Sequence, residues 1–123
     1  MIGEEAIALM HEVGLMQSLA ERLLAVAAEH NAERVVAIRL RIGSLAGVEV
    51  EAMRLAAQVV LAGTCAEGAT LTIDAIPAAY WCAPCGAEFE AATGLCECPR
   101  CGAFSRRPLR GRDLSLVSVE LVP

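Results

Sequence analysis

The chain has 123 residues and a formal net charge of −5 at pH 7, a length typical of one domain. Its composition, 56% hydrophobic and 20% charged, excludes a disordered chain, and the acidic balance argues against a general phosphate binder. No apolar run approaches the ~18 residues that cross a membrane. The first nine residues carry two glutamates and no basic segment, unlike a secretory signal. We therefore expect a cytoplasmic protein with no membrane partner.

The first part of the chain alternates between helical and strand patterns. Apolar residues recur at three- and four-residue spacing over 10–31, which predicts a helix, and Asn31 is suited to end it. A second helical pattern covers 49–62 and ends at Gly63. Alternation predicts strands at 35–43 and 69–76. In the first strand, one face carries Val36, Ile38, Leu40 and Ile42, and the other carries Arg39 and Arg41.

The remaining chain contains an irregular insert and one more strand. Residues 79–108 lack periodicity and hold five of the six cysteines. Residues 113–122 again show the alternation typical of a strand. The apolar residues change from one face of this strand to the other partway along, which indicates a bulge or a strand covered on both faces. We predict an α+β fold, a small three-stranded sheet with two helices plus an inserted zinc-ribbon-like four-cysteine module. Its α/β domain would comprise 10–78 and 109–123, and its zinc-binding domain 79–108.

The insert contains two closely spaced cysteine pairs in the pattern C-x2-C-x12-C-x2-C. The four cysteines are Cys82, Cys85, Cys98 and Cys101. Four thiolates suit tetrahedral Zn(II) and leave no open position for catalysis, so we expect a structural zinc. A redox or disulfide role is the alternative. Cys96 is either a spare thiol or an exchanging ligand, and Cys65 fits a small buried hydrophobic residue.

The chain has only two histidines, His11 and His30. His30 fits a helix end, where an imidazolium suits the dipole. His11 lies within Met10-His11-Glu12. As interior residues, His11 and Glu12 would be ordinary polar groups at a helix start.

Several segments together resemble one protein family. They are MHEVGLMQSL from Met10, the R-I-G-x-L-x-G-V-E segment from Arg41 to Glu49, the paired C-x-x-C motifs, and GRDLSLVSVEL near the end. This combination resembles the hydrogenase maturation nickel chaperones of the HypA/HybF family, from Met10 to about Val122. The resemblance implies nickel as cargo, held at Met-His-Glu by the α/β domain, and zinc at the cysteines.

The resemblance also implies partners and a nickel ligand set. The partners would be a nickel-handling GTPase and the hydrogenase large subunit, with the chain a monomer or homodimer. The nickel ligands would be the Met10 α-amine, the His11 amide and imidazole, and the Glu12 amide. Square-planar nitrogen ligation favours Ni(II) or Cu(II).

The chain departs from this pattern because its α-amine lies nine residues upstream of Met10. We favour translation that begins at Met10, with 1–9 a non-native or disordered leader. If the leader is genuine, His11 must bind nickel with a poorer ligand set.

The chain shows no catalytic motif, since it lacks a nucleophile–base pair and a GxxxxGK[ST] phosphate loop. The alternative function is a zinc-ribbon module that binds nucleic acid or has a regulatory role. Four aromatic residues could stack on bases, and arginines between 106 and 112 could contact phosphates. The acidic residues of the insert oppose this, and we expect no nucleic-acid partner. The arginine cluster would either dock a partner or form a solvated loop. The stacking candidates are Tyr80, Trp81, Phe89 and Phe104, and the acidic residues are Glu88, Glu90 and Glu97.

Overall fold

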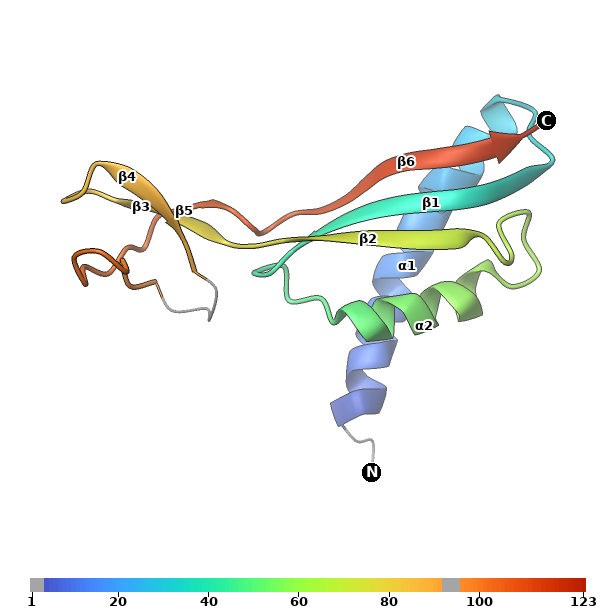
Figure 1. Ribbon diagram of the computed structural model, residues 1–123. Helices are drawn as coiled ribbons and strands as arrows, with labels where there is room; N and C mark the ends of the chain where they lie inside the picture. Colours follow the sequence, from blue (N-terminus) through green and yellow to red (C-terminus); the bar gives the residue numbers. More distant parts are fainter. Residues whose placement is uncertain (1–3, 92–95) are drawn as a thin grey trace. The chain divides into compact units, whose positions relative to one another are not determined.

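The computed structural model describes residues 4–91 and 96–123, with side chains from Met10 onward. Within these residues, two helices and six strands follow one another (Figure 1). They are α1 (Glu4–Glu29), β1 (Arg34–Gly43), α2 (Val50–Leu61), β2 (Thr70–Ile76), β3 (Ala79–Cys82), β4 (Ala87–Glu90), β5 (Pro108–Arg110) and β6 (Leu114–Val122). Within the described part of the chain, neither helix is long and apolar enough to span a membrane.

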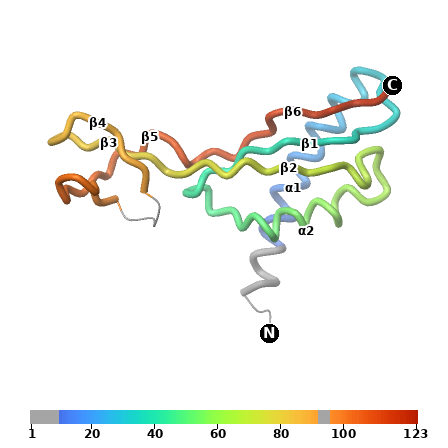
Figure 2. The backbone as a smooth tube through the Cα atoms, viewed as in Figure 1, coloured from blue at the N-terminus to red at the C-terminus, as the bar shows by residue number. Residues whose placement is uncertain are grey.

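The larger sheet confirms the predicted three-stranded architecture with two helices. Its order is β2-β1-β6, so β1 lies in the centre and the last strand of the chain pairs beside it (Figure 2). A second three-stranded sheet has the order β4-β3-β5. The chain divides into two compact units: 1–40 with 48–73 and 116–123, and 41–47 with 74–115. We call the second the cysteine unit.

Helix α1 begins earlier than predicted, at Glu4 rather than at residue 10. The segment EEAIAL consists of good helix formers and carries no breaker, so the helix extends through it. Its other end agrees with the prediction. Asn31 adopts a positive φ of 51°, and Ala32 N–H donates to the Ala27 carbonyl at 2.9 Å. Asn tolerates this left-handed conformation with little strain.

The two helices pack against each other and bury apolar faces. Helix α2 buries Met53, Ala56, Ala57 and Leu61. It ends where predicted, in a turn. Ala62 (φ −59°, ψ 134°) and Gly63 (φ 76°) form a type II turn, closed by Thr64 N–H donating to the Leu61 carbonyl at 3.1 Å. This turn type needs a residue at positive φ in its third position, and Gly63 supplies it.

Strand β1 confirms the predicted faces over most of its length. Ile38, Leu40 and Ile42 are buried, whereas Arg39 and Arg41 are exposed. Val35 is also fully buried, although it lies on the face of Arg39 and Arg41, which the alternating pattern assigned to solvent. Its N–H donates to the Cys65 carbonyl at 3.0 Å, so the segment after α2 lies against this end of the strand. In β6, Val117 is 43% exposed. The strand is therefore not covered on both faces there, and the bulge stays a prediction.

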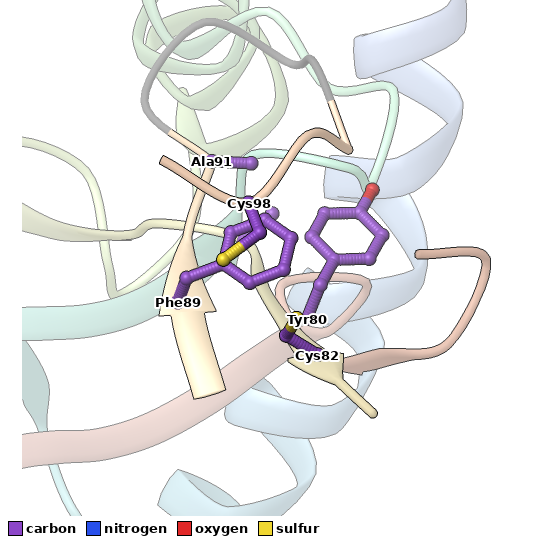
Figure 3. Packing of buried hydrophobic residues seen from close by; sticks show 6 residues of the cluster. Tyr80, Cys82, Phe89, Ala91 and Cys98 are labelled. Atoms are coloured by element: carbon purple, nitrogen blue, oxygen red, sulfur yellow. The ribbon is translucent and has the colours of Figure 1, made fainter. Parts of the chain in front are cut away.

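The cysteine unit has its own small core around a hairpin. Strands β3 and β4 are antiparallel, with Tyr80 opposite Phe89 and Cys82 opposite Ala87. The Tyr80 and Phe89 rings stack with centroids 5.9 Å apart and planes inclined by 23°. Figure 3 shows this pair beside Cys98. Strands of three or four residues are too short for periodicity to reveal, so the sequence did not predict β3, β4 or β5.

Two glycines in the cysteine unit let backbones approach closely. Gly43 N–H donates to the Asp113 carbonyl at 2.8 Å, and Leu45 N–H donates to the Gly111 carbonyl at 2.7 Å. A Cβ on Gly43 would overlap the backbone of Gly111. Gly111 has φ 108° and lies against Ala78, whose Cα would be 2.7 Å from an added Cβ. Gly43 belongs to the R-I-G segment, and this contact explains why the segment needs a glycine there.

Candidate metal-binding sites

Each cysteine pair lies on a tight turn that points its two sulfur atoms the same way. In the first turn, Gly86 N–H donates to the Cys82 carbonyl at 2.9 Å, and Gly86 has φ 62°. In the second, Gly102 N–H donates to the Cys98 carbonyl at 2.8 Å, and Gly102 has φ 75°. Glycine adopts this left-handed conformation without strain. The C-x-x-C-G spacing therefore produces two matching turns.

The structure brings all four predicted sulfur atoms together. Every pair lies within 4.8 Å. Cys82 Sγ is 3.5 Å from Cys101 Sγ, and Cys85 Sγ is 3.9 Å from Cys98 Sγ. Around tetrahedral zinc with Zn–S bonds of ~2.3 Å, neighbouring sulfurs would be ~3.8 Å apart. The donor set and its spacing fit Zn(II), which Cys82, Cys85, Cys98 and Cys101 would hold. Such a zinc would crosslink the two turns.

The four thiols differ in burial and in proton affinity. Cys82 and Cys98, the first cysteine of each pair, are buried, whereas Cys85 and Cys101 are exposed. Backbone amides of Cys101 and Arg100 lower the pKa of Cys98 to about 7. Hydrogen bonding with the thiols of Cys101 and Cys82 raises the pKa of Cys85 to about 12. A divalent cation must therefore displace protons from this cluster to bind.

The remaining two cysteines lie outside the group of four. Cys96 is partly buried and packs against the core of the cysteine unit. A hydrogen bond with Cys96 raises the pKa of the Tyr80 hydroxyl, so this thiol contacts the aromatic pair. Cys65 is partly buried after α2, somewhat less than the predicted buried position.

Two of the four aromatic residues of the insert are buried, and Trp81 is partly buried. Tyr80 and Phe89 are 5% and 8% exposed and stack on each other. They are therefore not accessible to bases, contrary to the stacking role considered for them. Only Phe104, at 76%, is largely exposed. Arg110 forms an ion pair with Glu88 through two hydrogen bonds of 2.9 and 3.2 Å. One arginine of the cluster thus has a partner within the protein.

The second candidate site lies on α1 at the Met-His-Glu segment. Met10 is 63% exposed. The His11 side chain is 58% exposed, and the adjacent Glu12 side chain is only 2% exposed. His11 Nδ1 lies 2.7 Å from Glu12 Oε1. A solvent-exposed imidazole therefore lies in contact with a buried carboxylate.

The helical pattern of the sequence itself indicates that Glu12 is buried. Glu12 precedes Met16 by four residues and shares its helix face with Leu23 and Ala27. All four are buried. The sequence interpretation treated Glu12 as a polar group at a helix start. It missed that the apolar stripe, extended one turn back, places a carboxylate in the core.

The backbone at this segment is engaged in the helix. Because α1 begins at Glu4, the amides of His11 and Glu12 lie beyond its first turn. There each N–H donates to the carbonyl four residues earlier. These amides can bind a metal only if the helix opens at this point. In a helix that began at Met10, they would be among the first four N–H groups, which have no helical partner.

The other histidine, His30, directly follows the last residue of α1, Glu29. His30 is exposed, and its Nδ1 lies 2.9 Å from the Val26 carbonyl oxygen. Its N–H also donates to that carbonyl, at 3.2 Å. This agrees with the predicted helix-end role.

The fold and the cysteine group define a class: small α+β metal-binding proteins in which a four-cysteine turn pair interrupts an α/β domain. A family model described as "Hydrogenase/urease nickel incorporation, metallochaperone, hypA" matches residues 10–121. The chain belongs to this HypA family and is a nickel metallochaperone of hydrogenase maturation, with a four-cysteine metal site. It is accordingly not an enzyme but a protein of the hydrogenase maturation machinery.

Relatives with the same description are similar over most of the chain. "Hydrogenase maturation factor HypA" of Nitrosospira multiformis is 40% identical over 113 residues, 92% of this chain and 98% of the relative. The HypA of a Picosynechococcus species is 36% identical over 113 residues, 92% and 100% of the two chains.

Solved structures support the fold. The solution structure of the Ni metallochaperone HypA from Helicobacter pylori matches with a TM-score of 0.62 and 18% identity, covering 90% of this chain and 97% of that one. A second solution structure of a HypA protein matches with a TM-score of 0.57 and 19% identity, covering 89% and 92%.

Proposed function

We propose that this chain binds Ni(II) at His11 and helps to insert it into the large subunit of a [NiFe]-hydrogenase. The observation that supports this proposal is the exposed imidazole of His11, which lies at the start of the segment that the family model matches. Of the two histidines of the chain, only His11 lies in the Met-His-Glu segment. A nickel-handling GTPase would supply the nucleotide hydrolysis that this chain does not perform. The site of action would be the cytoplasm.

We propose two roles for the two parts of the chain. The α/β domain, 10–78 and 109–123, would handle nickel, and 79–108 would bind a structural zinc. Zinc at the four cysteines would supply folding free energy to the small cysteine unit, since a segment this short buries little apolar surface. The four cysteine sulfurs would fill every coordination position of this zinc. No position with an exchangeable water would remain in this cluster, so we do not expect it to bind nickel.

The nickel ligand set depends on the residue that carries the free amine. In a chain that starts at Met10, the α-amine, the amides of His11 and Glu12, and the imidazole could form a square-planar nitrogen site. The amides would then lie at the unpaired start of the helix. The family match begins at Met10, which is the first residue of that form. With residues 1–9 present, the helix engages both amides, and His11 would bind with fewer partners.

The test is a nickel titration by isothermal calorimetry of four proteins: the 123-residue chain, a chain starting at Met10, and each with His11→Ala. We expect tightest binding in the chain starting at Met10 and loss of binding in both His11→Ala variants. Zinc content and helicity should stay unchanged. His30→Ala is the matched control and should retain nickel. Stoichiometric tight nickel in the His11→Ala variants would refute the site, and equal affinity of the two parent chains would refute the amine requirement.

A further inference from the structure

Phe104, in the cysteine unit, is the most exposed large hydrophobic residue that the structure describes, at 76%. Its backbone is held in a small hairpin that contains the second cysteine turn, where Phe104 pairs with Glu97 in an antiparallel bridge. Two backbone hydrogen bonds of 2.8 Å flank this bridge, from the N–H of Cys98 to the Ala103 carbonyl and from the N–H of Ser105 to the Cys96 carbonyl. The ring therefore extends into solvent from a fixed backbone, which lowers the entropy cost of binding a partner through it.

Three arginines lie within four residues of Phe104 along the chain. They are Arg100, Arg106 and Arg107, and all three are exposed. Among the described side chains, none of the three forms an ion pair, unlike Arg110, which pairs with Glu88. Aromatic residues and arginine are the types enriched at the centres of protein interfaces. Phe104 with these three arginines, which we call the Phe104 surface, therefore has the composition of a docking surface.

A cleft large enough for such a ring lies in the first unit, between α2 and the segment that leads to β2. Its volume is about 250 Å³, whereas an apolar cavity of about 150 Å³ is enough to hold benzene. Arg54 and Glu67 are the charged residues of its lining. Arg54 donates to the Leu71 carbonyl at 3.0 Å and lies 3.8 Å from Glu51. The apolar residues of the lining are Ala57, Leu61, Ala62, Ala66, Ala69 and Leu71.

An exposed apolar pair borders this cleft, which we call the α2 cleft. Leu55 and Val59 are 47% and 59% exposed, and they lie four residues apart on one face of α2. Gln58 and Ala62, each three residues further along, line the cleft. Glu51, one turn before Leu55, has a side chain that is 82% exposed. An apolar surface with carboxylates around it thus lies on the same chain as the Phe104 surface.

The net charges of the two units also differ in sign. The first unit carries ten acidic residues and four arginines, a formal charge of −6, whereas the cysteine unit carries five acidic residues and six arginines, a charge of +1. Opposite charges favour the encounter of two such surfaces and fix their orientation. The cysteine unit of one copy is therefore complementary to the first unit of another, both in charge and in the fit of an aromatic ring to an apolar cleft.

We propose that this chain self-associates by inserting Phe104 of one copy into the α2 cleft of a second copy. Arg100, Arg106 and Arg107 would then face carboxylates of that copy's first unit. Each copy carries both surfaces, so a two-fold dimer would form the contact twice. The inference goes beyond nickel delivery, and the association needs no nickel.

The first test is sedimentation velocity of the zinc-loaded 123-residue chain over a range of concentrations. We expect the dimer fraction to rise with concentration and to fall when salt is raised from about 0.1 to about 1 M, because the screening length falls from about 10 to about 3 Å. Phe104→Ala should weaken association by about 30-fold or more, the effect typical of a central aromatic residue. Leu109→Ala is the matched control, since Leu109 is a 43% exposed residue of the same unit, and it should associate like the parent.

The second test mixes two variants that cannot self-associate. Ala62 is exposed and lines the cleft, so Ala62→Phe should fill the cleft from its own chain without disturbing the core. Phe104→Ala lacks the ring but keeps the cleft. Each variant alone should be monomeric, whereas an equimolar mixture should form heterodimers, because one variant supplies Phe104 and the other supplies an open cleft. Circular dichroism and zinc content check that both variants fold.

Three results would overturn the inference. They are a parent chain that stays monomeric at every concentration, a dimer that Phe104→Ala leaves unchanged, and a mixture of the two variants that stays monomeric. A monomeric chain that instead binds an acidic partner protein through Phe104 would likewise exclude a second copy as the occupant. The proposed nickel site is tested separately, because His11→Ala should self-associate like the parent whether or not His11 binds nickel.

Discussion

Gly43 and Gly111 show how single residues determine the path of the backbone in the cysteine unit. A Cβ at Gly43 would overlap the carbonyl of Gly111, which cannot move as a flexible side chain could. We predict that Gly43→Ala destabilises the cysteine unit by about 2 kcal/mol or more. Urea denaturation followed by the fluorescence of Trp81, the only tryptophan, measures this directly.

Gly14→Ala is the contrasting substitution. Gly14 lies inside α1, and an added Cβ would meet nothing within 4 Å. Glycine in a helix costs about 0.5–1 kcal/mol relative to alanine, so Gly14→Ala should stabilise α1 by that amount, measured by circular dichroism. A Gly43→Ala protein as stable as the parent would contradict the close approach.

The thiol of Cys98 predicts how zinc affinity changes with pH. The metal-bound cluster holds fewer protons than the free thiols, so affinity falls as pH falls. The pKa of Cys98 is about 7, so below that pH the metal must displace one more proton. We expect the slope of log affinity against pH to increase by about one unit below pH 7, with each proton worth tenfold per pH unit. Competition with a chromogenic chelator measures it, and a constant slope across pH 7 would contradict the assignment.

The grouping of the four cysteines was the best predicted feature of the site. The spacing C-x2-C-x12-C-x2-C identified the four cysteines because turn geometry alone places each pair. Glu12 was different. Its burial follows from a helix face, and its contact with His11 follows from side-chain rotation, which spacing does not specify. The sequence thus identified both residues as candidates but did not predict that their side chains contact each other.

At the scale of elements, long periodic segments were predictable and short ones were not. Strands β1 and β2 and helix α2 agree with their predicted ranges because many residues repeat one pattern. Strands β3, β4 and β5 have three or four residues. Their stability depends on the Tyr80–Phe89 stack and the cysteine turns, which are contacts between segments. The start of α1 was also missed, because the three- and four-residue apolar spacing placed it at residue 10, whereas helix propensity extends it to Glu4.

The turns predict a specific effect of losing one ligand. Cys101→Ser should remove stoichiometric zinc and expose β3 and β4 to protease, because the second turn would no longer be crosslinked to the first. Cys65→Ser is the matched control, since Cys65 lies outside the four-sulfur group, and it should retain zinc. Plasma mass spectrometry gives zinc content, and limited trypsin digestion gives protection. Full zinc occupancy and unchanged protease resistance in Cys101→Ser would exclude this sulfur as a ligand.

At the scale of the whole molecule, the two compact units should depend on metal to different degrees. The first unit has an apolar core with Met16, Leu23, Leu40 and Met53 fully buried, and each such side chain contributes about 1.5–3 kcal/mol of burial free energy. The buried cluster of the cysteine unit consists of Ala78, Tyr80, Cys82, Phe89, Ala91 and Cys98, two of which belong to the four-sulfur group. Its folding free energy would come largely from zinc.

Zinc removal should therefore separate the stabilities of the two units. After treatment with a strong chelator, we expect hydrogen exchange measured by mass spectrometry to accelerate across β3, β4 and β5, while α1 and α2 keep their protection. Cys85 and Cys101 are exposed and give the chelator access to the cluster. Zinc added back should restore protection, and Mg²⁺ at equal concentration should not, because it prefers oxygen ligands. Uniform loss of protection through α1 would mean that the first unit also needs the metal, and the chain would then unfold as one cooperative body.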